Sequence, residues 1–386
     1  MSSFDVAIVG GGIIGGSIAF QLAAEKLRVV ILDRQQPGQE ASRAAAGMLS
    51  PGPDSQEALP LVPLGIESLR LFPRFISEVE EVSGLSSGFV QEGTLQIFFG
   101  PDAESECDKM AHEYRDLGLG FENIPLDEAR RLEKFLSPGA HAAALIPDEA
   151  TVDPRLLTIA VLEAALRRGV EIRRDCAVTE VVRNGDRSNG VVAGGERIAA
   201  EFVVVAAGAY SGGIDWLAHY APTHPVRGQM LALRPAYLKS SKVLRSEGGY
   251  LVPRSDGRIV AGSTLEDAGF NPQVTPSGIR KIIDAALNLI PELANAQILE
   301  TWAGLRPGTP DNLPILGPTD IEGLLIATGH YRNGILLAPV TAKLLKQWIL
   351  SEKVTMDTEA FSPSRFSARK LHTPAAKGAS VIPGFR

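Results

Sequence analysis

The sequence predicts an α/β protein in which separate stretches of chain build one domain on a parallel sheet. The remainder is expected to form an α+β domain with a mostly antiparallel sheet. Residues 4–34 have the pattern of a strand, a glycine-rich turn, a helix and a second strand. Buried-strand patterns return at 170–208, whereas 86–149 and 216–304 contain strand candidates such as "GTLQIFFG" and "GQMLALRP". A chain of 386 residues is long enough for two or three domains.

The first unit is a dinucleotide-binding fingerprint. The apolar run at 6–9 predicts a central parallel strand. Gly10, Gly12 and Gly15 follow it and satisfy the pattern G-x-G-x-x-G. The first glycine permits a tight turn, the second lets the backbone approach a pyrophosphate, and the third brings the next helix close to the sheet. That helix, expected over 13–25, directs its amino end at the phosphates.

The second strand of the unit ends in Asp33, 18 residues after Gly15. A carboxylate at this point can accept hydrogen bonds from both ribose hydroxyls, and it repels a 2′-phosphate. A lone glycine pattern is often a turn without function, but here every element of the unit follows in order. The fingerprint alone does not separate NAD from FAD.

The next segment, residues 34–52, favours FAD. A nicotinamide-binding domain would continue through regular strand–helix repeats, whereas this segment is rich in Ser, Ala and Gly. Such a loop lets the backbone lie along an extended ligand, with Ser42 and backbone amides free to bind phosphate. The alternative, a flexible linker, is weakened by the apolar Met48 and Leu49.

The later segment predicts two strands around Val178 and a buried strand that breaks at Gly208. The carboxyl ends of such strands face ligands in open α/β sheets, so Ala207 and Gly208 are candidate contacts. On this pattern alone, the segment is equally well a core strand and its turn.

The composition excludes several classes of function. A net charge of −7 argues against the basic face that nucleic acid or anionic lipid requires. Cys107 and Cys176 lie far apart in the sequence, so a disulfide framework is not expected. The six histidines form no ligand cluster, and no metal site is expected. Residues 6–24 are uncharged, but their five glycines and the lack of a basic amino end argue against a membrane span or a secretion signal. We therefore expect a cytoplasmic protein.

Five motifs together carry a family resemblance. "VAIVGGGIIG", "SRAAAGML", "VVVAAGAYSG", "GLRPGTPDNLPILG" and "GHYRNGILLAP" resemble the FAD-dependent D-amino-acid oxidase superfamily, and within it the glycine oxidases of thiamine biosynthesis. The resemblance covers about residues 3–350, with the motifs in the family's order. It implies an FAD-dependent oxidation of glycine, sarcosine or small D-amino acids, with molecular oxygen as the acceptor.

The resemblance also implies a division into domains. A discontinuous Rossmann-like FAD-binding domain is expected from 1–85, 150–215 and 305–352, and the α+β substrate domain from 86–149 and 216–304. Within the substrate domain, "RSDGR" predicts a hairpin with a type I′ turn. The tail at 361–386 is rich in Ser, Pro, Ala and basic residues and is expected to be partly disordered.

The cofactor contacts follow from the fingerprint and the resemblance. A helix starting near Gly334 is expected to direct its positive end at the flavin. No cysteine occurs in the late motifs, so non-covalent FAD is expected. The expected FAD contacts are Gly10, Gly12, Ile13, Ile14, Gly15, Asp33, Arg34, Ala41, Ser42, Arg43, Ala46, Gly47, Met48, Val178, Ala207, Gly208, His330, Tyr331, Arg332, Asn333, Gly334, Ile335 and Leu336.

The substrate contacts centre on Arg306, in "WAGLRPGTPD". By resemblance Arg306 binds the substrate carboxylate, which a guanidinium grips with two parallel hydrogen bonds. Tyr250 and Arg332 match further residues of the pocket, and Met48 and Leu265 are expected to form its apolar walls. Leu265 stands where the family pattern has methionine. The resemblance implies no catalytic base on the protein, so positioning carries the catalysis.

Other interpretations stay open from the sequence. Arg306 could instead pair with Asp311, and Tyr250 could be a core tyrosine. The protein could also be a D-amino-acid dehydrogenase that passes electrons to a quinone, or a flavin-binding module without turnover. The resemblance favours a homo-oligomer, expected as a tetramer.

Overall fold

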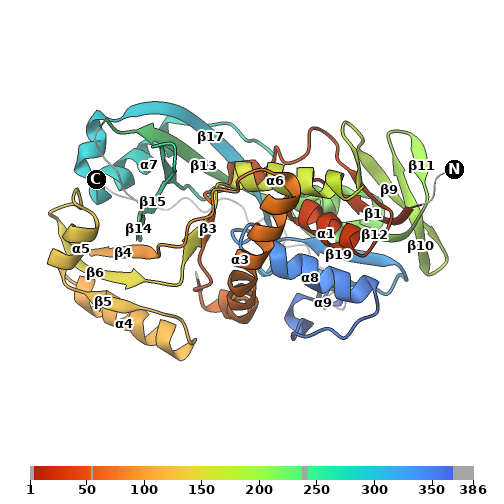
Figure 1. Cartoon of the computed structure of the whole chain (residues 1–386), viewed down its shortest axis with the longest axis horizontal. Coiled ribbons are helices and arrows are strands. Elements are labelled where there is room, and N and C mark those ends of the chain that lie inside the picture. The colour runs from red at the N-terminus through yellow and green to blue at the C-terminus, as the bar shows by residue number, and fades with distance from the viewer. Residues whose placement is uncertain (1–3, 54, 237–241, 368–386) are drawn as a thin grey trace, which may run out of the picture.

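The computed structural model describes residues 4–53, 55–236 and 242–367. It contains two large sheets that lie at opposite ends of an elongated molecule, with α3 (Val62–Ser83) and α6 (Pro154–Arg167) between them (Figure 1). The α/β class, with a parallel sheet and a mostly antiparallel one, is confirmed.

The first sheet has six strands and is built around the predicted fingerprint. Strand β1 pairs in parallel with β2 on one side and with β12 on the other. The strands, in their order across the sheet, are β18 (Ile315–Pro318), β19 (Leu324–Thr328), β12 (Ala200–Val205), β1 (Phe4–Val9), β2 (Val29–Leu32) and β8 (Glu171–Arg173). The edge strand β18 is antiparallel to β19.

Both faces of this sheet are covered because its central strands are apolar throughout. Val6 and Ile8 of β1 pack with helices α1 (Ile13–Ala24), α3, α6 and α8 (Ala338–Ile349). Ala7 and Val9 point the other way, into a core shared with a smaller three-stranded sheet. That sheet contains β9 (Val178–Asn184), β10 (Arg187–Ala193) and β11 (Glu196–Ile198).

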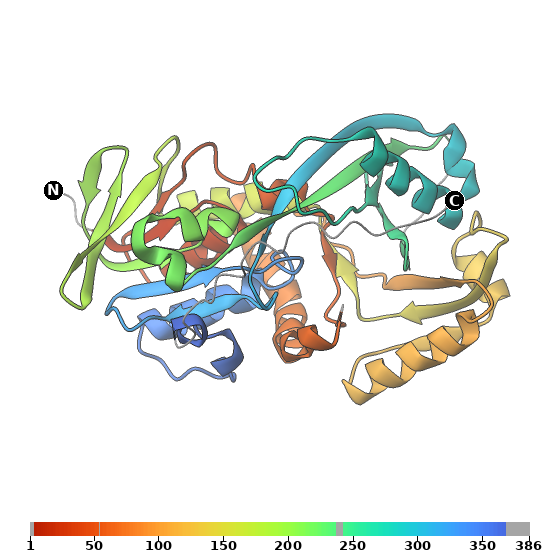
Figure 2. The ribbon, with the colours of Figure 1, turned by 180° about the vertical axis from the view of Figure 1, so that it is seen from behind.

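The second large sheet has eight strands. Its pairs in the described residues are antiparallel except β14 with β4. In order across the sheet the strands are β17 (Gln297–Gly308), β13 (His224–Arg234), β16 (Ile259–Gly262), β15 (Gly249–Pro253), β14 (Val243–Ser246), β4 (Thr94–Phe99), β6 (Ala140–Ile146) and β5 (Glu122–Ile124). The long strands β13 and β17 reach back toward the first sheet (Figure 2).

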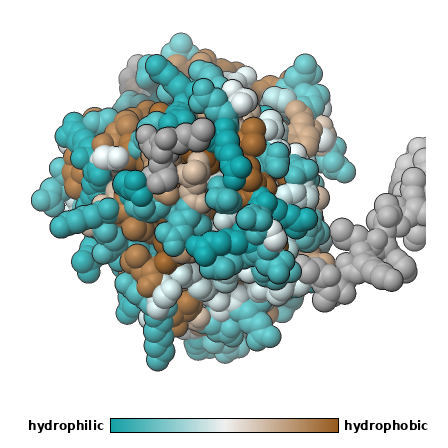
Figure 3. All heavy atoms as spheres, turned by 90° about the vertical axis from the view of Figure 1, so that its right-hand side faces the viewer, coloured by the Kyte–Doolittle hydropathy of each residue, from teal (hydrophilic) through white to brown (hydrophobic). Residues whose placement is uncertain are grey.

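The two faces of the second sheet have different partners. Leu231 and Leu251 face α7 (Pro276–Leu289) in one core. Met230 and Tyr250 face the opposite side and pack against Ala46, which comes from the segment after β2. This contact brings the eight-stranded sheet against the segment that follows β2. The opposite end of the molecule, which carries the three-stranded sheet of β9, β10 and β11, is covered mainly by hydrophilic side chains, with hydrophobic ones scattered in small groups (Figure 3).

Short elements complete the described chain. The segment expected as a loop at 34–52 contains one helical turn and one short strand. The remaining elements are α2 (Ala41–Ala44), β3 (Met48–Leu49), η1 (Gln56–Leu61), α4 (Ala103–Asp116), α5 (Leu126–Leu132), β7 (Ala150–Thr151), η2 (Gly208–Gly213), η3 (Asp215–His219), η4 (Pro291–Asn295), η5 (Glu359–Phe361) and α9 (Ser364–Ser367). Within the described ranges, no helix combines the length and apolar character that crossing a membrane requires.

Two local predictions are wrong. The last long helix starts at Ala338 and not near Gly334, because the chain makes an isolated turn first, closed by the hydrogen bond from Leu337 N to Asn333 O at 2.8 Å. The hairpin between β15 and β16 does not have a type I′ turn. Only Gly257 has positive φ there, and a three-residue loop is closed by the bond from Arg254 N to Arg258 O at 2.8 Å.

The first residues of the tail are folded in the part of the chain that the structure describes. Residues 361–367 are folded, with Phe361 and Phe366 buried. Arg365 Nε donates to Asp311 Oδ2 at 2.8 Å, which fixes this segment to the turn after β17. The rest of the tail, 368–386, lies outside the described residues.

We propose that the two large sheets mark two domains. The boundary expected at residue 305 moves to about 308, because β17 runs unbroken from Gln297 to Gly308.

Candidate active site

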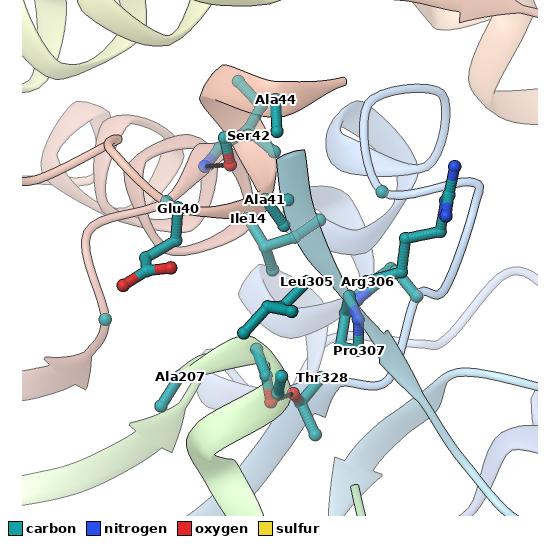
Figure 4. A pocket seen from close by; sticks show the side chains of 18 of the residues that line it. Ile14, Glu40, Ala41, Ser42, Ala44, Ala207, Leu305, Arg306, Pro307 and Thr328 are labelled. Carbon is teal, nitrogen blue, oxygen red and sulfur yellow. Dashed lines mark hydrogen bonds between the residues drawn. The ribbon is translucent and has the colours of Figure 1, made fainter. Parts of the chain in front are cut away.

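A cavity of about 530 Å³ lies between the two sheets. This volume is in the usual range of small-molecule sites, roughly 300–1,000 Å³. Its wall includes Val9, Leu32 and Ala206, at or just beyond the carboxyl ends of β1, β2 and β12, where open α/β sheets bind ligands. In Figure 4, Leu305, Arg306 and Pro307 of β17 cross the cavity, with Ser42 and Ala44 on one side and Ala207 and Thr328 on the other.

The glycine turn forms the floor of one end of the cavity. Gly10 has φ +104°, and a Cβ there would lie 2.5 Å from Ala206 O, so only glycine fits. A Cβ on Gly15 would lie 2.0 Å from Gly10 O, which is why the helix can sit so close to the turn. Gly15 does not itself line the cavity. Its observed contribution is the close packing of α1 against the glycine turn.

Asp33 is held at the same end. Its Oδ2 accepts a hydrogen bond from Gly11 N at 2.7 Å, and its Oδ1 accepts one from Gln35 N at 3.0 Å. Ser42 Oγ accepts from Ile13 N at 2.9 Å, which draws the segment containing α2 over the amino end of α1. These bonds place a carboxylate, a hydroxyl and the start of a helix along one wall.

Most of the predicted FAD contacts line this cavity. Besides Gly15, three of the predicted residues do not line it: Arg43, Asn333 and Leu336. Arg43 lies 3.8 Å from Glu300 in an ion pair outside the cavity. Asn333 and Leu336 turn away because residues 333–337 form the turn before α8, where Leu336 O accepts from Ser68 Oγ at 2.6 Å. The predicted residues that do line it are Gly10, Gly12, Ile13, Ile14, Asp33, Arg34, Ala41, Ser42, Ala46, Gly47, Met48, Val178, Ala207, Gly208, His330, Tyr331, Arg332, Gly334 and Ile335.

The turn at 330–332 closes the cavity near its middle. Burial lowers the pKa of His330 to about 3, so its ring is neutral, and its Nε2 lies 3.0 Å from Thr341 Oγ1. Tyr331 has φ +47°, and its N–H donates to Pro307 O at 3.0 Å. That bond couples the turn to β17. Arg332 is exposed to solvent on its outer side and also lines the cavity.

Arg306 lies in the cavity wall on β17, in the eight-stranded sheet, and is partly buried. Its Nη2 donates to Ser263 Oγ at 2.8 Å, and its Nη1 donates to Thr264 O at 3.2 Å. The guanidinium lies over Gly228 on the neighbouring strand β13. Asp311, the alternative partner that the sequence leaves open, forms an ion pair with Arg365.

Tyr250 lines the cavity beside Met230. The two residues flank Gly262 across three adjacent strands, and the Tyr250 hydroxyl lies 3.6 Å from Met230 Sδ. Met48 faces them from the cofactor side. The predicted wall residue Leu265 does not line the cavity, and 63% of its surface is exposed. The neighbouring Glu266 is held by Arg227, so the side chain at 265 turns outward, and Met230 supplies the apolar wall instead.

The sequence does not predict every residue of the cavity wall, and those it misses include Gly228, Met230, Ser263, Tyr210 and Phe270. Gly228 and Met230 are two positions apart on one predicted strand, so the strand's alternation places them on one face. Which face of the strand meets the cavity depends on how β13 pairs with β17. That pairing cannot be deduced from the sequence. Phe270 lies on a loop without a strand or helix pattern, and no signal could have found it.

The cavity fits FAD better than a smaller ligand. It extends from Asp33 and the glycine turn past the turn at 330–332 to Arg306. Gly208 has φ +56°, and a Cβ there would meet nothing within 4 Å, which leaves an open cradle beside the pyrophosphate-binding turn. A dinucleotide with a three-ring system attached at its far end fills such a shape. Within the described ranges, no group of acidic, histidine and cysteine side chains could hold a metal ion.

Comparisons with known proteins agree with this fit. A family model described as FAD dependent oxidoreductase (DAO) matches residues 5–348. The glycine oxidase of Geobacillus kaustophilus is 33% identical over 369 residues, which cover 94% of this chain and 97% of that protein. A crystal structure of glycine oxidase from Geobacillus kaustophilus superposes with a TM-score of 0.90 at 31% identity, covering 95% of this chain and 99% of that one.

A further relative is longer. The bifunctional protein ThiO/ThiG of Synechocystis sp. is 36% identical over 375 residues, which cover 94% of this chain but 54% of that protein. The chain thus spans about half the length of this bifunctional relative. The family match and the near-complete match to glycine oxidases agree with the resemblance drawn from the motifs, and FAD is the family's cofactor. The chain belongs to the DAO family of FAD-dependent oxidoreductases.

Proposed function

We propose that this protein oxidises glycine, and with it sarcosine and small D-amino acids, in an FAD-dependent reaction that serves thiamine biosynthesis. The amine becomes an imino acid, which water hydrolyses to a keto acid and ammonia or an amine, and oxygen is reduced to hydrogen peroxide. The names of the relatives, glycine oxidase and ThiO/ThiG, support this substrate and this pathway.

The observation that carries the proposal is the setting of Arg306. A guanidinium presents five N–H donors in a planar fork, so it can be fixed by protein contacts and still grip a carboxylate with two parallel bonds. Ser263 Oγ and Thr264 O fix it at the substrate-side end, beside the Tyr250 ring that lines the same cavity. A small amino acid anchored there by its carboxylate directs its Cα into the cavity.

The rest of the wall favours small amines. Met230 and Met48 face the anchor from two sides and exclude water from the space around the Cα. The carboxylates found among the described lining residues are Asp33 and Glu40, and both lie at the dinucleotide end. Asp33 accepts backbone N–H bonds there, and Glu40 pairs with Arg34. His330 is neutral and bonded to Thr341.

The protein's contribution is therefore positioning and desolvation, and the substrate ammonium loses its proton to solvent before the reaction. FAD, when bound, supplies the hydride acceptor for the Cα–H. Arg332, at the rim of the cavity, adds positive charge that attracts an anionic substrate.

The test uses purified holoprotein and glycine without oxygen. Glycine is expected to bleach the yellow colour, and admitted air is expected to restore it and release hydrogen peroxide. If glycine, sarcosine and D-alanine all fail to bleach it, the protein is a flavin-binding module without turnover. Bleaching that only an added quinone reverses would show a dehydrogenase instead of an oxidase.

We propose in addition a cytoplasmic homo-oligomer, and a tetramer in particular, on the family resemblance. Mass measurement by light scattering on the purified protein tests the oligomer. A monomer would contradict it.

A further inference from the structure

A stack of three side chains links the two domains beside the cavity. The guanidinium of Arg34 lies over the ring of Tyr210, with Cζ 3.5 Å from the ring centroid. The ring of Phe270 stacks against Tyr210, with the centroids 4.8 Å apart and the planes inclined by 30°. Arg34 is further paired with Glu40. All four residues line the cavity.

The stack joins three separate parts of the chain. Arg34 directly follows Asp33 at the end of β2, and Tyr210 follows the open cradle at Gly208. Phe270 comes from the loop between β16 and α7, in the substrate domain. Phe270 is thus a residue of the substrate domain that lines the dinucleotide end of the cavity.

The loop that carries Phe270 is fixed at its base. Arg227, which is 8% exposed, forms an ion pair with Glu266, and its Nη1 donates to Asn271 O at 3.3 Å. Gln229 Nε2 donates to Glu266 Oε1 at 2.7 Å. These bonds hold both flanks of Phe270, so the ring is presented toward Tyr210 even though 53% of its surface is exposed.

An exposed phenylalanine on a fixed loop would normally be costly, since it leaves apolar surface in water. Here the ring covers Tyr210, and together the rings wall off the part of the cavity next to Asp33. We propose that Tyr210 and Phe270 form an aromatic clasp that retains the adenosine end of FAD. The clasp raises the barrier to release of the dinucleotide, while the Arg306 end of the cavity is unaffected.

The proposal rests on FAD binding by the family and not on the identity of the amine. Its failure is therefore distinguishable from failure of the proposed function, because it is read out as cofactor affinity and release. The readouts are the dissociation constant of FAD, from titration of apoprotein and ultrafiltration of free flavin, and the rate of flavin release after dilution.

Phe270→Ala is expected to weaken FAD binding and speed its release by on the order of three- to tenfold, the size of a lost aromatic pair. Tyr210→Ala is expected to have the same effect. The double variant should lose less FAD affinity than the sum of the two single losses, because both substitutions remove the same contact between the rings. Phe270→Tyr and Tyr210→Phe keep the rings and are expected to bind FAD like the unaltered protein.

The matched control is Ile298→Ala, an apolar side chain on β17 with the same exposed fraction, 53%, that does not line the cavity. It should leave FAD binding unchanged. Thermal unfolding of each apoprotein verifies the fold, and truncation of so exposed a ring opens no core cavity. Unchanged FAD affinity and release in Phe270→Ala would overturn the clasp. So would unchanged FAD binding with a raised KM for glycine, which would place the loop on the substrate path.

Discussion

The guanidinium of Arg306 lies flat over the backbone of Gly228, on the strand next to its own. A Cβ at position 228 would lie 2.2 Å from Nη1, 2.3 Å from Nη2 and 2.4 Å from Cζ of Arg306. No methyl group fits in that space. Because position 228 of β13 has no side chain, Arg306 on β17 can reach Ser263 and Thr264.

Gly228→Ala should displace Arg306 and lower kcat/KM for glycine by on the order of tenfold or more, because the guanidinium loses at least one of its charged hydrogen bonds. FAD content should stay normal. Steady-state kinetics and the flavin spectrum measure both. The control Gly139→Ala has an ordinary backbone conformation and its nearest neighbour at 3.6 Å, so it should be silent. Equal kinetics in the two variants would show that Gly228 has no part in placing the arginine.

Asp33→Ala should weaken FAD binding by about tenfold or more. The carboxylate is held by Gly11 N and Gln35 N at the position where the family binds ribose hydroxyls, and hydrogen bonds to a charged group contribute about 1.5–3 kcal/mol each. Titration of the apoprotein with FAD measures the change. Unaltered affinity would place the adenosine elsewhere.

FAD should be released intact when acid precipitates the protein. Among the described residues, no cysteine lines the cavity: Cys107 is buried beside β4 and β6, and Cys176 packs beside β12. Absorbance at the flavin wavelength in the supernatant is the measurement. A yellow pellet after washing would reveal a covalent bond and contradict the prediction.

His330 should make the apoprotein less stable in acid. Burial lowers its pKa from 6.5 to about 3, so between these values the unfolded chain binds a proton that the folded chain does not. The free energy of unfolding should therefore fall as pH falls through that window, and the loss should be smaller in His330→Gln, which keeps a partner for Thr341. Urea unfolding of both proteins at pH 8 and pH 5 gives the comparison. A difference between them that does not change with pH would refute it.

The sequence alone predicts the residues of the cofactor half of the site, but it predicts fewer of those in the substrate half. Gly10, Gly12 and Asp33 belong to one continuous unit with fixed spacing, so their meeting at the cavity is predictable from local pattern. The motif around Arg306 predicts that this residue belongs to the site. What holds it, Gly228 and Ser263, depends on the pairing of β13 with β17 and of β13 with β16, across long stretches of chain.

The wrong predictions for Leu265 and for the start of α8 also arise from contacts between residues that are distant in the sequence. Leu265 matched the family by position, but the ion pair of Glu266 with Arg227 turns the backbone so that this side chain faces solvent. The sequence predicts the start of α8 four residues early because the apolar residues after Gly334 are compatible with a helix. Its real start at Ala338 is set by the preceding turn, whose Tyr331 is tied to β17.

The most direct test of the account asks whether Arg306 recognises a carboxylate. Bleaching of the holoprotein without oxygen is followed with glycine and with methylamine, which lacks the carboxylate, in the unaltered protein and in Arg306→Ala. The exposed Arg280→Ala, whose side chain is 84% accessible, is the control. We predict that Arg306→Ala keeps its FAD and loses on the order of a hundredfold or more of the rate with glycine, but little with methylamine. An Arg306→Ala protein that still prefers glycine as strongly as the unaltered protein would contradict the account.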